Sequence, residues 1–278
     1  ADVAWQRNNL SAEAANVRRA LELEPDSPEA LRAMLGVVLR EKQPAKALSL
    51  ARSVQARNEA AAVGYALEGE VEFHLEHFDA AVAAFRKAMA RNGGADVAPR
   101  LHLAWLRAGQ VAEAKQFAEA WLREHPNDGV FIEHLGAEAL ARRDWAAAQA
   151  RYEALLQRQP RQVMAMNNLA LALASQRKAG AVEWAERAVA AAPNQPALLD
   201  TLAMAYASDD QFEQAVEQQR KAVALAPQAA GLRLNLARLL LQAGAKTDAR
   251  AELEQLQKLG AAFGEQAEVQ RLIKSLGA

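Results

Sequence analysis

The sequence predicts an all-α solenoid: a stack of about seven helix pairs, preceded by an incomplete pair and followed by a capping helix. The first observation is a period, since Pro126, Pro160, Pro193 and Pro227 follow one another at intervals of 34, 33 and 34 residues. A fixed period of this size is typical of repeat architectures. The second is that each period contains two short amphipathic helical patterns. The third is that polar turn residues recur between the two patterns, at the same place in each period.

The stretch 135–160 (LGAEALARRDWAAAQARYEALLQRQP) shows one unit most clearly. Its two helical patterns are separated at Arg143-Asp144. Small residues, Gly136 and Ala148, stand where the two backbones meet, and the bulky residues are Leu135, Trp145 and Tyr152. Such a pair cannot bury its apolar face alone, so it must stack on its neighbours.

The spacing Leu-Gly-x2-Ala-x5-Trp-x2-Ala-x3-Tyr-x7-Pro in this stretch resembles the tetratricopeptide repeat. The family's Leu-Gly, Ala, Phe/Tyr and Pro positions are occupied here by Leu135-Gly136, Ala148, Tyr152 and Pro160. Two positions differ: Ala139 stands where the family usually has Tyr, and Leu155 where it usually has Ala. The resemblance implies a right-handed α-solenoid, or superhelix, in which the first helix of each pair lines a concave face. We expect an all-α fold of this kind over residues 1–278.

The predicted units follow from the prolines and from the turns within each period. We expect a partial repeat at 1–27, seven repeats at 28–59, 60–93, 94–127, 128–161, 162–194, 195–228 and 229–262, and a cap at 263–278. The predicted turns between paired helices are 42–44, 76–77, 108–110, 143–144, 176–178, 208–210 and 243–245. Gly93-Gly94 is either a helix stop or a softer joint between two halves.

Composition excludes several classes of function. The 33 basic and 34 acidic side chains are interspersed, so no basic patch attracts nucleic acid. Cysteine is absent, which excludes disulfides and thiol catalysis. No apolar run reaches the roughly 18–20 residues that cross a bilayer. Ala1 is not a natural start, so we expect a mature form or an excised fragment whose targeting signal has been removed.

No catalytic constellation is found, and the sequence predicts a protein that is not an enzyme and binds no cofactor or metal. His74 and His77 lie three residues apart, near Glu72 and Glu76. Two histidines at this spacing could supply two of the ligands of a metal ion. A third ligand at a convincing spacing is missing, so these are polar residues at a helix end. Gly-rich phosphate loops and nucleophile elbows are absent.

The candidate site is the concave groove. Residues just before the Leu-Gly position, or beside it, would point into the groove and contact an extended peptide: Asn168, Asn235, Thr201, His134, Arg100, Asn167 and Arg233. An asparagine amide offers both a donor and an acceptor to a peptide unit. The alternative is that these asparagines bond neighbouring helix backbone and recognise no ligand.

Several stretches resemble one subfamily more closely: 43–52, 67–71, 78–88, 243–253 and 264–268, with the shortened unit near 176–181. They are similar to the C-terminal half of the tetratricopeptide lipoproteins of the bacterial PEP-CTERM/exosortase system. That resemblance implies a periplasmic parent protein, associated with exopolysaccharide production and protein sorting. Its only membrane attachment would be a lipid anchor outside this sequence. A cytoplasmic location is the alternative.

The predicted function is a non-enzymatic scaffold that binds an extended peptide, or a partner's helix, in its groove. Two alternatives remain. One is a polysaccharide-binding or synthase-organising export factor, which aromatic platforms would favour. The other is a structural protein that self-associates end to end through the truncated first unit.

Overall fold

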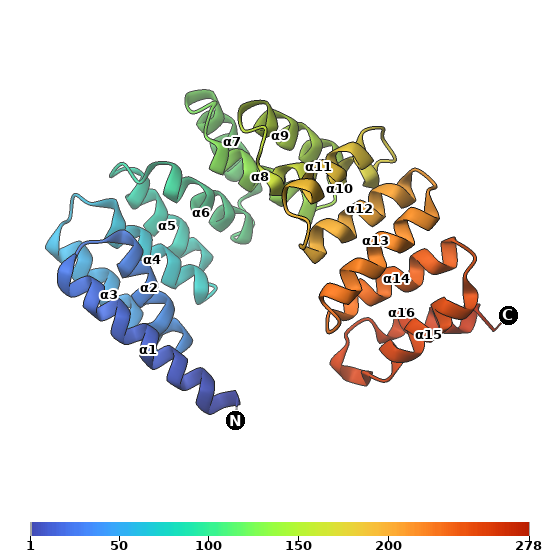
Figure 1. Cartoon of the computed structure of the whole chain (residues 1–278). Helices are drawn as coiled ribbons and strands as arrows, with labels where there is room; N and C mark the ends of the chain where they lie inside the picture. Colours follow the sequence, from blue (N-terminus) through green and yellow to red (C-terminus); the bar gives the residue numbers. More distant parts are fainter. Residues whose placement is uncertain (1, 278) are drawn as a thin grey trace. The chain divides into compact units, whose positions relative to one another are not determined.

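The computed structural model describes the backbone of residues 2–277 and the side chains of residues 11–277. Over that range it contains sixteen α-helices, one short 3-10 helix and no strand, which confirms the all-α prediction (Figure 1). The first eight α-helices are α1 (Asp2–Leu23), α2 (Pro28–Arg40), α3 (Pro44–Arg57), α4 (Ala62–His74), α5 (Phe78–Met89), α6 (Gly94–Arg107), α7 (Val111–Glu124) and α8 (Gly129–Ala141). The others are α9 (Trp145–Arg158), α10 (Val163–Ser175), α11 (Ala181–Ala191), α12 (Pro196–Ser208), α13 (Phe212–Leu225), α14 (Ala230–Gln242), α15 (Lys246–Gln257) and α16 (Gln266–Ser275), with η1 (Gly260–Ala262) before α16.

The helices from α2 to α15 form successive pairs, and each tight turn within a pair contains a residue in the left-handed region directly after the first helix. These residues are Lys42, Glu76, Gly109, Arg143, Arg177, Asp210 and Gly244, with φ between 51° and 77°, and the connection from α10 to α11 contains a second one, Gly180, with φ 89°. All seven lie in the turns that the sequence predicts. Five of them are not glycine, although glycine adopts this conformation at the least cost.

The turn at Arg143 shows why the helices stop there. The amide of Arg143 donates to the carbonyl of Leu140 at 2.9 Å, and the amide of Asp144 donates to that of Ala139 at 2.9 Å. This is the Schellman arrangement, which satisfies carbonyls left open at a helix C-terminus. The Asp144 side chain then accepts from the amide of Ala147 at 3.1 Å and caps α9. The same two residues therefore end one helix and begin the next.

The chain divides into two compact units, residues 1–131 and 132–278. The boundary falls within α8 and not at Gly93-Gly94. Within unit 1 the first helices α2 and α4 pack on each other, and within unit 2 α12 packs on both α10 and α14. The first helices named here thus pack side by side within their own unit. The division of the chain into repeats at the predicted boundaries remains a prediction.

The core of each unit is built where first and second helices meet at small residues. The alanines at the small position of the second helix are fully buried: Ala81 and Ala114 in unit 1, and Ala148, Ala215 and Ala249 in unit 2. Gly69 makes the same kind of approach in unit 1, because a Cβ there would lie 2.6 Å from the ring of buried Phe85. Backbone contact this close leaves no room for a larger side chain.

Candidate functional site

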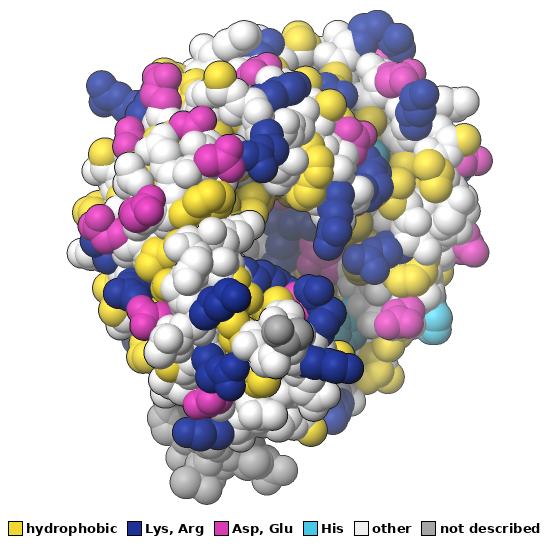
Figure 2. Space-filling view, turned by 90° about the vertical axis from the view of Figure 1, so that its right-hand side faces the viewer, with side chains coloured by type: hydrophobic (Ala, Val, Ile, Leu, Met, Phe, Trp, Pro, Cys, Tyr) yellow, Lys and Arg dark blue, Asp and Glu magenta, His cyan; other side chains and the backbone are white. Residues whose placement is uncertain are grey.

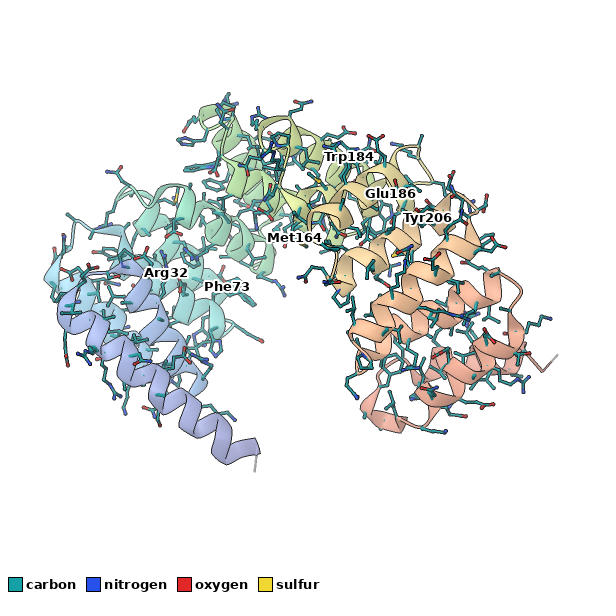
Figure 3. All side chains as sticks on the ribbon, viewed as in Figure 1. Arg32, Phe73, Met164, Trp184, Glu186 and Tyr206 are labelled. Atoms are coloured by element: carbon teal, nitrogen blue, oxygen red, sulfur yellow. The ribbon has the colours of Figure 1, made fainter. Side chains whose placement is uncertain are left out.

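The layer of first helices in unit 2 carries most of the predicted groove residues. Asn168 lies on α10, Thr201 on α12 and Asn235 on α14. Met164 precedes Asn168 by four residues, so both occupy one face of α10. Met164 is 48% exposed (Figure 3).

Asn168 is hydrogen-bonded within unit 2. Its Nδ2 donates to the hydroxyl of Tyr152 at 3.0 Å, and its Oδ1 accepts from Nδ2 of Asn167 at 3.3 Å. Asn167 is only 6% exposed, and its own Oδ1 is buried without a hydrogen-bond partner in the structure. Asn168 is therefore positioned by α9 and by its own helix.

Asn235 is the centre of a second set of hydrogen bonds. Its Nδ2 donates to Oδ1 of Asp200 on α12 at 2.9 Å, and its Oδ1 accepts from the guanidinium of Arg238 at 3.3 Å. Asp200 also accepts from Nε2 of Gln219 at 2.7 Å. These contacts link α12, α13 and α14, and they hold the amide of Asn235 in one orientation.

The other groove candidates in unit 2 are also engaged. The hydroxyl of buried Thr201 donates to the carbonyl of Ala197 at 3.1 Å, so it bonds the backbone of its own helix. Arg233 donates to Glu252 at 2.5 Å. Burial lowers the pKa of His134 from 6.5 to about 4, so this imidazole is neutral at physiological pH. A peptide contact at these residues remains a prediction.

Sequence reasoning missed two exposed methionines. Met204 on α12 is 36% exposed and follows Asp200 by one turn, as Met164 precedes Asn168 by one turn. Methionine is flexible and polarizable, and it is used at surfaces that accept varied partners. The spacing of Met164 from Asn168 and of Met204 from Asp200 was readable from the sequence, but the exposure of the two methionines depends on how the helices stack.

The aromatic side chains near α11 and α12 are occupied within unit 2. The guanidinium of Arg187 lies 4.0 Å from the ring centroid of Trp184, and the Tyr206 hydroxyl donates to Glu186 at 2.7 Å (Figure 3). The hydrogen bond to Glu186 raises the pKa of Tyr206 to about 12. Arg187 therefore covers one face of the Trp184 ring, and the Tyr206 hydroxyl is engaged with Glu186.

In unit 1 the predicted residue Arg100 belongs to a cluster of four charges on α2, α4 and α6. Nε of Arg100 and Nε of Arg32 each lie 3.4 Å from Oε1 of Glu70. Both arginines also pair with Asp96, Arg100 at 3.4 Å. Burial raises the pKa of Glu70 above its usual 4.5, and Arg100 and Arg32 oppose that shift. Sequence reasoning singled out none of the other three residues.

Charges elsewhere are mixed. Figure 2 shows Lys and Arg side chains among Asp and Glu on the face that it displays.

The histidines near the end of α4 do not form a metal site with the other described residues. Nδ1 of His77 lies 2.8 Å from Glu72. Among the residues described, no group of three or more His, Asp and Glu side chains is arranged to hold a metal ion. Within the same residues, each helix is too short or too polar to span a bilayer.

Comparison with known proteins agrees with this architecture. A family model for the tetratricopeptide repeat matches residues 135–196 and 201–262. The comparisons support the tetratricopeptide repeat family. The matched segments begin within α8 and end after α15, so they lie on helices of unit 2. No curated protein matches the chain.

Solved tetratricopeptide and related structures share the fold at low identity. A tetratricopeptide repeat protein from Parabacteroides merdae is 14% identical with a TM-score of 0.60, over 91% of this chain and 99% of that chain. PilF of Pseudomonas aeruginosa is 20% identical with a TM-score of 0.58, over 78% and 99%. MamA of Desulfovibrio magneticus RS-1 is 24% identical with a TM-score of 0.53, over 60% and 96%. At such identities the likeness shows the fold alone.

Proposed function

We propose that the chain is a non-enzymatic protein-interaction scaffold, and that the first helices of unit 2 bind an extended peptide or a partner's helix. The observation that carries this proposal is the exposure of Met164 and Met204 on the same layer as Asn168 and Asn235. The methionines supply adaptable apolar contact, and the ordered amides supply hydrogen bonds of fixed direction.

The amides act through the contacts that hold them. Because Asn168 is bonded to Tyr152 and Asn167, it loses little further rotamer freedom when a peptide docks. The same holds for Asn235 between Asp200 and Arg238. A peptide contact on such a surface has modest area, so we expect a transient complex.

The test uses the whole chain as bait in bacterial envelope extract, with retained proteins identified by mass spectrometry. Met164→Gln/Met204→Gln removes the apolar contact without touching a buried position. Leu225→Gln is the matched control, because Leu225 is exposed at the end of α13, a second helix of the same unit. A protein retained by the wild type and the control, but lost from the double variant, supports the proposal.

Overlapping synthetic peptides of that protein, measured by fluorescence anisotropy, then locate the bound segment. Asn168→Ala/Asn235→Ala should weaken that peptide by about 1–2 kcal/mol per lost amide contact. A protein set unchanged in the Met164→Gln/Met204→Gln bait overturns the proposal for this surface. Retention of glycan with no protein would favour a polysaccharide-handling role instead.

We further propose that the scaffold works in the bacterial envelope, in PEP-CTERM and exopolysaccharide machinery, with the parent protein lipid-anchored in the periplasm. Resemblance of stretches such as 43–52, 67–71 and 78–88 supports this proposal. Fractionation of cells that carry the tagged parent gene tests it. Recovery in the membrane fraction, released by detergent and accessible from the periplasm, is expected. Recovery in the cytosol contradicts it.

A further inference from the structure

We propose that Met164 and Met204 form a modification site, at which a peroxide converts both side chains to methionine sulfoxide and thereby weakens the partner complex of unit 2. This inference rests on the scaffold function proposed above, because it concerns the regulation of the same surface. The reaction requires a peroxide and the two exposed thioethers, and it involves no other group of the chain.

The five methionines of the chain differ in exposure. Met164 is 48% exposed and Met204 is 36% exposed. Met166 lies two residues after Met164 on the same helix and is only 5% exposed. Met34 and Met89 are half-buried in unit 1. A peroxide must reach the sulfur atom to react with it, so we expect Met164 and Met204 to be oxidised first.

The chain has no sulfur atom that would react in their place. Cysteine thiolates are the groups that most redox-sensing proteins use, because they are strong nucleophiles that oxidants attack readily. This chain contains no cysteine. The exposed thioethers of unit 2 are therefore the sulfur atoms that an oxidant meets.

The reaction balances with hydrogen peroxide as the oxidant. A lone pair of the methionine Sδ attacks one peroxide oxygen, so the S–O bond forms as the O–O bond breaks. The sulfur loses two electrons and the peroxide gains them. The proton on the transferred oxygen passes to the departing hydroxide, which leaves as water. Methionine sulfoxide reductases reverse the change, one enzyme for each epimer of the sulfoxide.

The product alters the surface on which the two residues lie. Met164 precedes Asn168 by one turn on α10, and Met204 follows Asp200 by one turn on α12, which packs on α10. A thioether is apolar and flexible, whereas a sulfoxide is polar and carries an acceptor oxygen. An apolar partner side chain docked there leaves that oxygen without a hydrogen bond. We expect the oxidised surface to bind the same partner about tenfold or more weakly.

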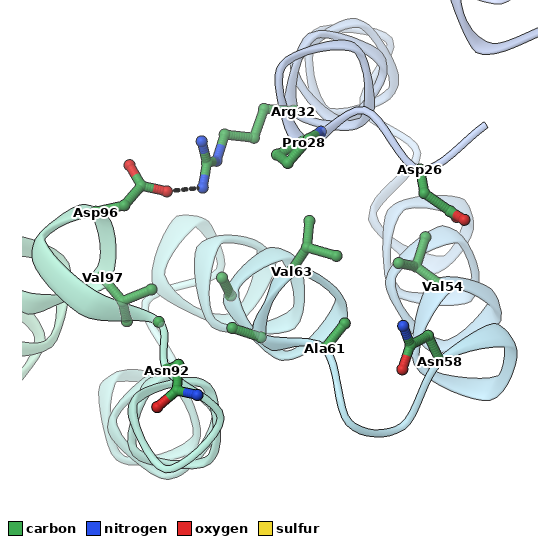
Figure 4. Close-up of a pocket in the computed structure, with 13 residues that line it drawn as sticks. Asp26, Pro28, Arg32, Val54, Asn58, Ala61, Val63, Asn92, Asp96 and Val97 are labelled. Carbon is green, nitrogen blue, oxygen red and sulfur yellow. Dashed lines mark hydrogen bonds and ion pairs between the residues drawn. The ribbon is translucent and has the colours of Figure 1, made fainter. Parts of the chain in front are cut away.

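A hollow in unit 1 supplies an internal reference. It has a volume of about 390 Å³, and its lining includes Arg32, Asp96, Val54 and Val63 (Figure 4). The guanidinium of Arg32 is directed at Asp96 in this view. None of the described residues that line the hollow is a methionine. A partner held there should therefore be insensitive to peroxide treatment of the chain.

The first measurement follows the reaction itself. The whole chain is treated with hydrogen peroxide for increasing times, and its peptides are analysed by mass spectrometry for the added oxygen atom. Met164 and Met204 should be oxidised several-fold faster than Met166, while the helical circular dichroism signal stays unchanged. Oxidation of Met166 as fast as that of Met164 overturns the proposal.

The second measurement compares binding before and after oxidation. The oxidised chain, freed of peroxide, serves as bait in the envelope extract beside the untreated chain. Proteins that are lost from the Met164→Gln/Met204→Gln bait should also be lost from the oxidised bait, and should return after treatment of that bait with methionine sulfoxide reductases. A labelled peptide from such a protein should bind the oxidised chain about tenfold or more weakly in anisotropy titrations.

Met164→Leu/Met204→Leu is the matched control, because leucine keeps an apolar side chain of similar size and contains no sulfur. This variant should bind the same peptide as the wild type does. Peroxide should not change its affinity, although Met34, Met89 and Met166 are still present. Weaker binding after oxidation of this variant overturns the proposal, since the effect then arises at another residue.

The proposed function and its regulation fail in different ways. A protein that depends on Met164 and Met204, but binds the oxidised chain as tightly as the untreated chain, leaves the surface in place and rejects the modification site. Proteins retained equally by the wild-type and Met164→Gln/Met204→Gln baits reject the surface, and the modification site with it.

Discussion

Gly136 on α8 lies against the ring of Tyr152 on α9, since a Cβ atom at position 136 would be 2.8 Å from Cζ of that ring. Tyr152 is completely buried, and its hydroxyl accepts the amide of Asn168 from the next helix pair. One aromatic side chain therefore joins the contact within a pair to a candidate residue of the groove.

Gly136→Ala should destabilise unit 2. The added methyl group overlaps a ring that cannot move outward, because it is buried and its hydroxyl is held by Asn168. Overpacking of this kind costs about 1–3 kcal/mol, offset in part by the roughly 1 kcal/mol helix preference of Ala over Gly. Urea unfolding followed by circular dichroism measures the net loss.

The matched control is Gly231→Ala on α14, where no heavy atom lies within 4 Å of the added Cβ. It should be neutral or stabilising by up to about 1 kcal/mol. An equal loss of unfolding free energy in the two variants would show that the Tyr152 ring does not exclude a side chain at position 136.

Tyr152→Phe should separate the packing role of this ring from its hydrogen bond. The variant keeps the ring and removes the hydroxyl, so stability should fall by about 0.5–1.5 kcal/mol, the net value of one hydrogen bond. The Asn168 amide is then no longer held by α9 and must be ordered when a ligand docks. A peptide that binds α10 should therefore bind Tyr152→Phe more weakly than the wild type in anisotropy titrations, and unchanged binding would show that the bond to Tyr152 does not prepare Asn168 for a ligand.

The helices and their turns were predictable because their causes are local. At Arg143-Asp144, a Schellman stop and an aspartate N-cap use residues that are adjacent in sequence. The same turn recurs at seven places, and each recurrence strengthens the prediction. Glu76 and Lys42 are residue types that rarely adopt a positive φ, yet their place in the period was enough to predict a turn at each.

The contacts of the candidate site were not predictable in the same way. The partner of Asn168 is sixteen residues away in a different helix, and Arg32 and Asp96 pair across 64 residues. Such contacts depend on the register between stacked helices, which the period of the sequence does not determine. Exposure of Met164 and Met204 likewise follows from stacking and not from composition.

Gln219→Glu should strongly destabilise unit 2. Gln219 is completely buried, and its Nε2 donates to Asp200 at 2.7 Å and to the carbonyl of Leu232 at 3.0 Å. An ionised carboxylate can donate to neither acceptor and lies beside the carboxylate of Asp200. We expect a loss of about 3 kcal/mol or more in urea unfolding at neutral pH.

The loss in Gln219→Glu should shrink in acid, because protonation of the new carboxyl restores one donor. Gln214→Glu makes the same chemical change at an exposed position of α13 and should be near neutral. A Gln219→Glu protein as stable as Gln214→Glu would show that the amide of Gln219 contributes nothing to the links among α12, α13 and α14.

The pH dependence of stability should show the burial of His134. Because burial lowers its pKa from 6.5 to about 4, the native state binds fewer protons than the unfolded state between these two pH values. The contribution of neutral His134 is therefore complete above pH 6.5 and is lost as the pH falls toward 4. A shift of this size corresponds to about 3 kcal/mol at the acid end.

The measurement is the difference in unfolding free energy between the wild type and His134→Gln, taken at intervals across this range. The wild type should lose stability relative to the variant as the pH falls. His74→Gln, at an exposed position of α4, is the matched histidine control. Parallel curves for wild type and His134→Gln would mean that His134 takes up its proton as easily in the native state as in the unfolded chain.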